Sequence, residues 1–346
     1  MKEFGYYCLD RWKAEGYITD QTDLNRLFGY DEPGVYDLYG LGWCEAAFEP
    51  CFPERILEDR GTHEVVQDFA GRKVLYFKGR RNGFMPEYLD HPVKDMRSWE
   101  EDVRWRLDPD TPARRQQDAA ALSGAREAQA AGKVISQRLV GGYMYLRSLI
   151  GPETLLYTFY DDPALIDACM ERWLELADAV IARHQEAVEI DELFFAEDIC
   201  YNVSSLISQD RIRRFLFPYY EQLIANTRRR KKSGPLYLQV DTDGRIDAVI
   251  DLYRSVGFNY FSPFEVAAGS DVVAARKAHP DILISGGIDK RILAAGKEAI
   301  DRELDRILPY MKEQGGYIPT CDHGVPEEVA FEDYLYFRER LLAYAT

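Results

Sequence analysis

The sequence predicts an α/β fold, a single (β/α)8 TIM-type barrel with an N-terminal helical and hairpin extension. Six segments with strand character, each followed by a helical segment, succeed one another after residue 133. Repeated βα units with short loops give a parallel sheet covered by helices, and right-handed crossovers leave a doubly wound sheet or a closed barrel. No GxGxxG motif follows a strand, so the dinucleotide-binding alternative lacks its signature. A chain of 346 residues, 46% of them hydrophobic, is long enough for such a barrel.

Residues 1–132 are expected to form the extension and to pack on the barrel, all within one structural domain. A hairpin is predicted where two β-prone runs flank the turn Ala70-Gly71-Arg72. The expected hairpin strands are 64–69 and 73–78, the expected helices 4–16, 20–28, 98–106 and 112–131, and the expected loops 35–53 and 86–92.

Residues 133–346 are expected to supply the main βα units. The longest predicted helix has apolar residues at helical spacing, beginning with Leu165, Ile166 and Cys169. The expected strands are 134–140, 193–196, 235–240, 260–262, 282–285 and 316–318. The expected helices are 144–150, 152–159, 163–188, 211–231, 247–256, 271–278, 294–314 and 331–344.

Composition excludes some functions. The net charge of −16 disfavours nucleic acid, because phosphate binding needs clustered Lys and Arg. The basic run 228–232 fits a solvated helix end. No apolar run reaches the roughly 18 residues of a membrane span, and the first residues have no signal-peptide core. Six widely spaced cysteines without a CxxC pair indicate a reduced, cytoplasmic protein.

Polar residues follow each predicted strand of the barrel. In this fold the active site lies at the C-terminal ends of the strands, so these residues are the candidates for the site. In chain order they are Gln137, Arg138 and Tyr143; Glu197, Asp198 and Tyr201; Asp241 and Asp243; Glu265; Asp289 and Lys290; and Asp322 and His323.

The stretch 233–247 is the centre of this pattern, because its strand ends in Asp241-Thr242-Asp243-Gly244. Alternate residues of an extended segment point the same way, so Asp241 and Asp243 can converge on one point. Together with His323 and Glu197 they offer the carboxylate oxygens and imidazole of a hard-ligand metal site. A metal-free polar pocket whose acids share protons, and simple helix capping, remain open as alternatives.

Most of the chain resembles the uroporphyrinogen decarboxylase superfamily, which also contains the cobalamin-dependent methyltransferases. The resemblance lies in residues 141–163, 194–224, 241–271, 286–293 and 315–337, and residues 68–95 are similar to uncharacterised branches of the superfamily. It implies a single (β/α)8 barrel enzyme that acts on a small molecule and is often a homodimer.

The resemblance also implies site residues. In the methyltransferases, a His-x-Cys-Gly element and a later Cys bind zinc; Asp241-Thr242-Asp243-Gly244 falls at that element and His323 at or next to the later Cys. Both thiolate ligands are therefore replaced, although Cys321 is near enough to reach. The decarboxylases have an N-terminal Arg-Gln-Ala-Gly-Arg-Tyr motif and a later His before Gly. His323 keeps the later part, whereas residues 11–17 keep one arginine of the motif at best. Arginines that could substitute are Arg80, Arg81, Arg138 and Arg147.

Three functions are therefore considered. The first is a methyltransferase or demethylase that works with a corrinoid carried by a partner protein and with a divalent metal, zinc or a harder cation. Asp241, Asp243, His323 and Glu197 would hold the metal, and Asp198, Tyr201 or His323 would move protons. The second is a metal-free decarboxylase of uroporphyrinogen or another small carboxylated substrate, in which Asp241 or Asp243 holds a substrate nitrogen. The third is a non-catalytic ligand-binding barrel. Expected substrate contacts are Gln137, Arg138, Tyr143, Arg147, Glu265 and Asp289.

The N-terminal third is rich in aromatic residues, including Phe48, Phe52, Phe84 and Tyr88. Exposed apolar patches usually mark contacts, so these residues are expected to cover the barrel mouth or to contribute to a twofold interface. A homodimer is the expected assembly.

Overall fold

The structure is a computed structural model that describes residues 3–79 and 86–345. The chain divides into two compact units, each described here by itself. Unit 1 comprises Met1–Gly34, Ile199–Leu206 and Tyr237–Thr346, and unit 2 comprises Val35–Asp198 and Ile207–Leu236. These bounds differ from the predicted division at residue 132, and the single-domain organisation stays a prediction. Arg80, Arg81 and Phe84, named above, lie outside the described residues.

Unit 2 contains three parallel strands in the order β1-β6-β7. The strands are β1 (Val35–Leu41), β6 (Val134–Val140) and β7 (Glu192–Ala196). The helices are α3 (Met96–Ser98), α4 (Pro112–Ala130), α5 (Gly142–Ile150), α6 (Pro152–Asp161), α7 (Pro163–Ala187), α8 (Gln209–Phe215) and α9 (Phe217–Arg230), with a π-helical turn at Trp99–Val103 and a 3-10 turn at Arg104–Leu107. A core of buried side chains from β1, β6 and α4, including Leu38, Leu122 and Ile135, joins these layers.

Strand β1 corrects the sequence prediction, which treated residues 35–53 as mostly loop. Val35 pairs with Val134, and the register continues to Leu38 opposite Gln137. Leu38 is fully buried in the core, whereas Tyr39, the next residue along, is 60% exposed. The alternation of a half-buried strand is therefore present, but aromatic residues and Gly40 obscured it.

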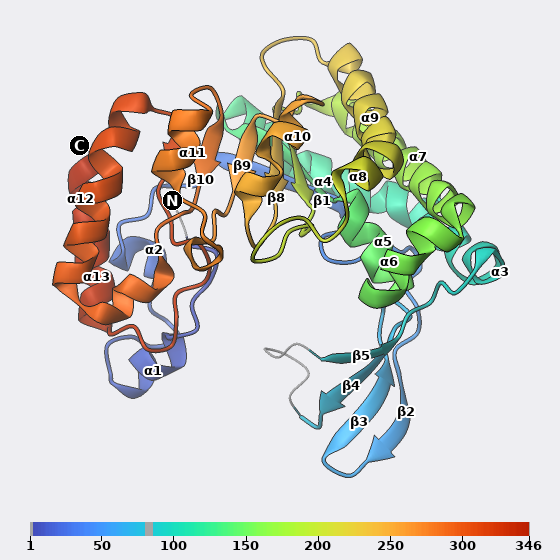
Figure 1. The fold of residues 1–346 in the computed structure, drawn as a ribbon, viewed down its shortest axis with the longest axis horizontal. Coiled ribbons are helices and arrows are strands. Elements are labelled where there is room, and N and C mark those ends of the chain that lie inside the picture. Colours follow the sequence, from blue (N-terminus) through green and yellow to red (C-terminus); the bar gives the residue numbers. More distant parts are fainter. Residues whose placement is uncertain (1–2, 80–85, 346) are drawn as a thin grey trace. The chain divides into compact units, whose positions relative to one another are not determined.

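A second sheet in unit 2 is antiparallel, with the order β2-β3-β4-β5 (Figure 1). Its strands are β2 (Arg55–Arg60), β3 (His63–Gln67), β4 (Lys73–Phe77) and β5 (Glu87–Asp90). The β3–β4 hairpin is the predicted one, with Val66 opposite Val74. Strand β5 lies in a segment that was predicted to be a loop, so that prediction is wrong. Phe48 is buried and packs edge-on against Phe52, which accounts for part of the aromatic content of this region.

Unit 1 contains four parallel strands in the order β8-β9-β10-β11. The strands are β8 (Tyr237–Asp241), β9 (Tyr260–Ser262), β10 (Leu283–Ser285) and β11 (Tyr317–Ile318). The helices are α1 (Leu9–Ala14), α2 (Leu24–Leu27), α10 (Ile250–Arg254), α11 (Val272–Ala278), α12 (Lys297–Gln314) and α13 (Phe331–Ala345), with 3-10 turns at Ile246–Ala248, Val266–Ala268 and Lys290–Ala295. Each predicted βα unit after residue 237 is present, with bounds shifted by a few residues at most element ends.

In both units the parallel strands alternate with helices, which is the arrangement that the sequence predicts. Among the described residues, the helices are all too short or too polar to cross a membrane.

Candidate active site

Glu197 follows β7 and is fully buried beside the first turn of α5. Its Oε1 accepts a hydrogen bond from the Tyr143 backbone N–H at 3.0 Å, and its Oε2 accepts one from the Tyr220 hydroxyl at 2.5 Å. A carboxylate is favourable at a helix N-terminus, where backbone N–H groups lack partners. Glu197, a predicted metal ligand, therefore has both oxygens engaged within unit 2.

Asp198, Arg147 and Tyr143 form a polar group in the same unit. An Arg147 guanidinium nitrogen lies 2.8 Å from an Asp198 carboxylate oxygen. Asp198 has φ +39°, a region that non-glycine residues rarely occupy and that concentrates at functional sites. Burial raises the pKa of Tyr143 to about 12, so its hydroxyl stays protonated. Three predicted site residues are thus brought together.

Gln137 and Arg138 make internal contacts instead. Gln137 is fully buried, and its amide contacts the Leu38 carbonyl at 3.2 Å and His184 Nδ1 at 2.6 Å. Arg138 donates from Nε to Asp37 at 2.8 Å and lies over the Phe194 ring at 3.8 Å. Both side chains contribute to the packing of unit 2, and their role as substrate ligands stays a prediction.

In unit 1, Asp241 and Asp243 have different partners. Asp241 ends β8 and accepts a hydrogen bond from the Ser262 hydroxyl on β9 at 2.8 Å. Asp243 lies beyond the strand end with its side chain 51% exposed, and its Oδ2 is 3.8 Å from His323 Nε2. The structure therefore brings Asp243 to His323, and it directs Asp241 to the neighbouring strand.

His323 is subject to two opposing influences. Asp243 raises the pKa of His323, although 3.8 Å is longer than a hydrogen bond and makes the contact an ion pair. The Gly324 N–H donates to Nδ1 at 2.9 Å, which favours the neutral ring with its proton on Nε2. Asp243 outweighs burial, which acts to lower the pKa of His323, and the pKa is raised. Protonation strengthens the attraction of His323 to Asp243.

Glu265 connects three of the strand-end loops of unit 1. Its Oε2 accepts the Gly244 N–H at 2.8 Å, in the loop that carries Asp243. Its Oε1 is 3.6 Å from the Lys290 ammonium, in the loop after β10. Lys290 in turn acts electrostatically on His323, whose pKa it lowers. Lys290, a candidate by its place at a strand end but with no predicted role, therefore belongs to the His323 cluster.

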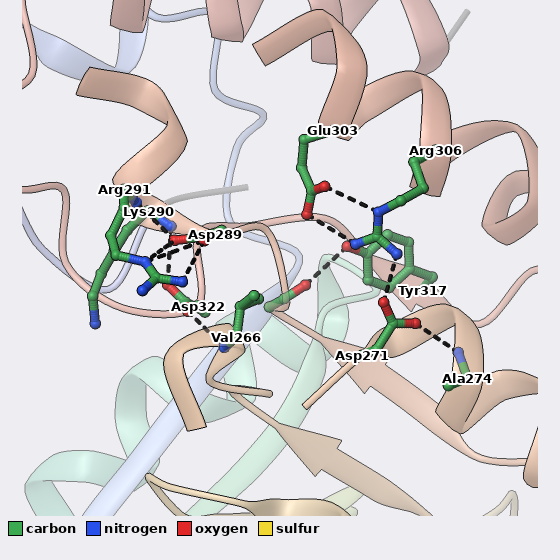
Figure 2. A network of polar contacts seen from close by, with 11 residues as sticks. Val266, Asp271, Ala274, Asp289, Lys290, Arg291, Glu303, Arg306, Tyr317 and Asp322 are labelled. Atoms are coloured by element: carbon green, nitrogen blue, oxygen red, sulfur yellow. Dashed lines mark hydrogen bonds and ion pairs between the residues drawn. The ribbon is translucent and has the colours of Figure 1, made fainter. Parts of the chain in front are cut away.

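The sequence placed Asp322 among the candidates at a strand end but predicted no role for it. Asp322 is fully buried, and its two oxygens accept backbone N–H groups of Val266 at 2.9 Å and Lys290 at 3.1 Å (Figure 2). Its own N–H donates to the Ile288 carbonyl at 2.8 Å. Burial raises the pKa of Asp322 against the lowering effect of these N–H groups. The feature of the sequence that pointed to Asp322 was its position after a strand, next to His323.

Figure 2 also shows two further groups of polar contacts, one around Arg291 and one around Arg306. Asp289, a predicted substrate ligand, caps the following 3-10 turn through the Arg291 N–H at 2.9 Å and pairs with the Arg291 guanidinium at 2.7 Å. Burial acts to raise the pKa of Asp289, but Arg291 outweighs it and lowers the pKa. Arg306 similarly joins Glu303 to Asp271, the N-cap of α11.

Tyr201 has an exposed ring, and its carbonyl accepts a hydrogen bond from the Arg245 N–H at 2.9 Å. This contact fixes its backbone to the loop after β8. Among the described residues of unit 1, the predicted catalytic hydroxyl of Tyr201 has no hydrogen-bond partner.

Among the described residues, the predicted metal ligands are not arranged as a complete metal site. Within residues 3–79 and 86–345, no group of three or more His, Cys, Asp or Glu side chains is placed to hold one ion. A histidine that binds a metal through Nε2 usually donates from Nδ1, whereas Nδ1 of His323 accepts. Cys321 is fully buried beside Glu3, and burial raises the pKa of its thiol well above the ordinary value, which opposes thiolate ligation. These residues do not fit a metal as they stand, and metal binding stays a prediction.

The chain belongs to the uroporphyrinogen decarboxylase (URO-D) family, whose family model matches residues 106–342. A curated relative, the uroporphyrinogen decarboxylase of Saccharopolyspora erythraea, is 27% identical over 175 residues. That match covers 48% of this chain and 45% of the relative, so the chain spans less than half the length of the relative it matches.

Among solved structures, the chain is similar to a methyltransferase from Methanosarcina mazei. The TM-score is 0.53 at 16% sequence identity, and the likeness covers 79% of this chain and 76% of that one. At this identity the likeness concerns the fold alone. It confirms the predicted fold class, a TIM-type (β/α)8 barrel with an N-terminal extension.

Glu192 at the start of β7 generates a pH prediction. Burial raises its pKa from 4.5 to about 7, opposed by Arg138, and its buried Oε1 has no hydrogen-bond partner among the described residues. The folded state therefore binds a proton more tightly than the unfolded state. The contribution of Glu192 to the free energy of unfolding is complete below pH 4.5 and is lost as the pH rises through about 7. The total loss in the free energy of unfolding is about 3 kcal/mol.

Replacement of Glu192 by Gln, a neutral isostere, should remove this dependence. Urea unfolding of both proteins between pH 5 and 8 is the measurement, and the difference between them should grow in favour of Glu192→Gln as pH rises. A constant difference across that range would show that Glu192 is already ionised in the folded state.

Proposed function

We propose that this chain is a URO-D-family lyase that decarboxylates a small substrate bearing more than one carboxylate. The observation that supports this function is the charged cluster on the strand-end loops of unit 1. It contains two pairs of opposite charge, Asp243 with His323 and Glu265 with Lys290. Such a cluster offers both a proton donor and an anion-binding group.

The reaction replaces a carboxylate by a proton. The bond between the carboxylate and its carbon breaks, CO2 leaves, and the electron pair stays on the substrate carbon. The carbon then takes a proton from Nε2 of cationic His323, which leaves the imidazole neutral with its proton on Nδ1. In this form Nδ1 cannot accept the Gly324 N–H, so that contact must be released for the step. Asp243 supports this role because its negative charge stabilises the imidazolium form.

Lys290 would orient the substrate through a carboxylate that is not lost. A cation bound to the departing carboxylate would oppose its release as neutral CO2, since it would stabilise the starting state. The ammonium is 3.6 Å from Glu265, a loose pairing that leaves it able to bind another anion. Lys290 therefore fits a substrate-binding role better than a proton-transfer role.

The comparisons support decarboxylation at the level of the family. The matching family model is that of uroporphyrinogen decarboxylase, and the curated relative carries the same description. Uroporphyrinogen itself carries many carboxylates and needs several guanidinium partners. We therefore propose a smaller carboxylated substrate.

The second candidate is methyl transfer or demethylation with a divalent metal and a corrinoid carried by a partner protein. The fold likeness to the Methanosarcina mazei methyltransferase over 79% of the chain favours it. Asp243 and His323, which lie together, would be two of the ligands. A metal held there would supply Lewis-acid chemistry, but it would need ligands beyond those that the described residues bring together. A cytoplasmic homodimer remains the proposed assembly for either candidate.

Lys290→Met should weaken binding of a dicarboxylic acid. The probes are porphobilinogen, a pyrrole with two carboxylates, and its dimethyl ester, measured by isothermal titration calorimetry. Loss of a charged hydrogen-bond donor should weaken binding of the acid roughly tenfold or more. The ester should bind both proteins equally poorly.

The matched control is Lys277→Met, which removes an exposed lysine from α11 of the same unit. It should leave binding of both probes unchanged. Equal effects of the two lysine substitutions, or equal affinity of wild-type protein for acid and ester, would contradict the assignment of Lys290.

Elemental analysis of protein purified without a tag separates the two candidates. Decarboxylation as proposed here expects well under one divalent ion per chain, and CO2 release that survives chelation. Methyl transfer expects about one ion per chain, lost when Asp243→Asn and His323→Ala are combined. A stoichiometric ion in wild-type protein would therefore overturn the first candidate in favour of the second.

A further inference from the structure

We propose that the N-terminal segment 3–7 is a positioning element of the active site, which holds the loop that carries His323. Glu3 and Phe4 are its positioning residues. The sequence pattern predicted a helix over residues 4–16, whereas helix α1 begins at Leu9. No pattern linked residues 3–7 to His323, which lies more than 300 residues later in the chain. The inference rests on the proposed role of His323, and its contacts lie entirely within unit 1.

The backbone of the segment is paired with the His323 loop. Tyr6 forms a parallel bridge with Val325. The Tyr7 N–H donates to the Val325 carbonyl at 2.9 Å, and the Val325 N–H donates to the Gly5 carbonyl at 2.9 Å. These two bonds fix the chain two residues after His323.

Glu3 fixes the chain two residues before His323. Its side chain is buried, and Oε2 accepts the Cys321 N–H at 2.8 Å. Its Oε1 accepts from the Tyr334 hydroxyl at 3.4 Å, which links the same carboxylate to α13. A buried carboxylate with these bonds strongly disfavours displacement of the loop, because loss of either partner would leave a buried charge unsatisfied.

The segment also contacts His323 and its neighbour directly. The Phe4 ring is stacked on the His323 ring with centroids 6.5 Å apart and an interplanar angle of 24°. At Gly324 an added Cβ would lie 2.8 Å from the Tyr7 ring. Glycine therefore allows the close approach of Tyr7, and the imidazole is bounded by Phe4.

Helix α1 continues the attachment beyond the segment. The Trp12 indole N–H donates to the Val329 carbonyl at 2.9 Å, and Arg11 donates to the Glu328 carbonyl at 2.9 Å. The whole chain from Glu3 to Trp12 thus lies along residues 321–329. The segment that contacts His323 therefore continues into helix α1, which is itself hydrogen-bonded to residues 328 and 329.

The first test measures the exposure of Cys321 by iodoacetamide labelling and peptide mass spectrometry of the full chain. Cys321 is fully buried in the wild-type protein. Glu3→Ala should label Cys321 about tenfold faster, because a buried charged partner of its backbone is lost. Glu3→Gln keeps an oxygen acceptor and should restore protection to within about twofold.

The matched control is Asp10→Ala, which removes an acid of α1 whose side chain is 99% exposed. It should leave Cys321 labelling unchanged. If Glu3→Ala leaves Cys321 as protected as in wild-type protein, Glu3 does not hold the loop and the proposal is overturned.

The second test reports on His323 itself and does not depend on a stable Glu3→Ala protein. The imidazole Hε1 resonance of His323 is assigned by its loss in His323→Gln and is then followed in Phe4→Leu. Removal of the stacked ring should shift this resonance and leave those of the other four histidines in place. An unchanged His323 resonance would overturn the role of Phe4.

These readouts are independent of catalysis. Absence of decarboxylase activity in wild-type protein would defeat the proposed function and leave both readouts intact. Conversely, wild-type activity that persists unchanged in Glu3→Ala and Phe4→Leu would defeat the positioning role alone.

Discussion

The geometry of the candidate site in unit 1 depends on the buried carboxylate of Asp322. It accepts N–H groups from Val266 and Lys290, which lie in the loops after β9 and β10, while its own backbone bonds to Ile288. Three loops are therefore fixed around one charged group. A buried carboxylate that loses its hydrogen bonds is costly, so these loops have one strongly preferred arrangement.

That arrangement determines where the candidate site residues lie. The contact of Asp322 with the Lys290 backbone sets the position from which the Lys290 ammonium meets Glu265. Glu265 then contacts the loop of Asp243, and Asp243 meets His323, the residue after Asp322. The four loops form a closed ring of contacts. A charged cluster built in this way is preorganised, which is what general acid catalysis and substrate orientation require.

The sequence predicted the parallel βα units well because their strands are short apolar runs bounded by turn residues. The bounds of β6 and β9 were predicted to the residue. Strand β1 was missed because aromatic residues and Gly40 obscure its alternation and because position 37 is an aspartate, which pairs with Arg138 from the neighbouring strand. Such a pairing between residues a hundred positions apart leaves no mark in local periodicity.

The site was predicted only in part, again because contacts between residues distant in sequence leave no local pattern. Alternation suggested that Asp241 and Asp243 share a direction, but that rule holds only inside a strand, and β8 ends at Asp241. Beyond it the chain turns, so Asp243 reaches His323 while Asp241 bonds to Ser262. Asp322 and Glu3 act through backbone N–H groups of distant loops, contacts that residue identity and spacing do not reveal.

The most direct test of this account is hydrogen exchange of the Val266 and Lys290 backbone amides in Asp322→Asn, with Asp281→Asn as an exposed control. The asparagine amide offers one acceptor oxygen, and it turns an N–H donor toward one of the two backbone donors. We predict that the two amides, in different loops, exchange roughly tenfold or more faster together, while the control leaves both unchanged. If both amides keep their wild-type protection in Asp322→Asn, Asp322 does not organise the loops and the account of the site is wrong.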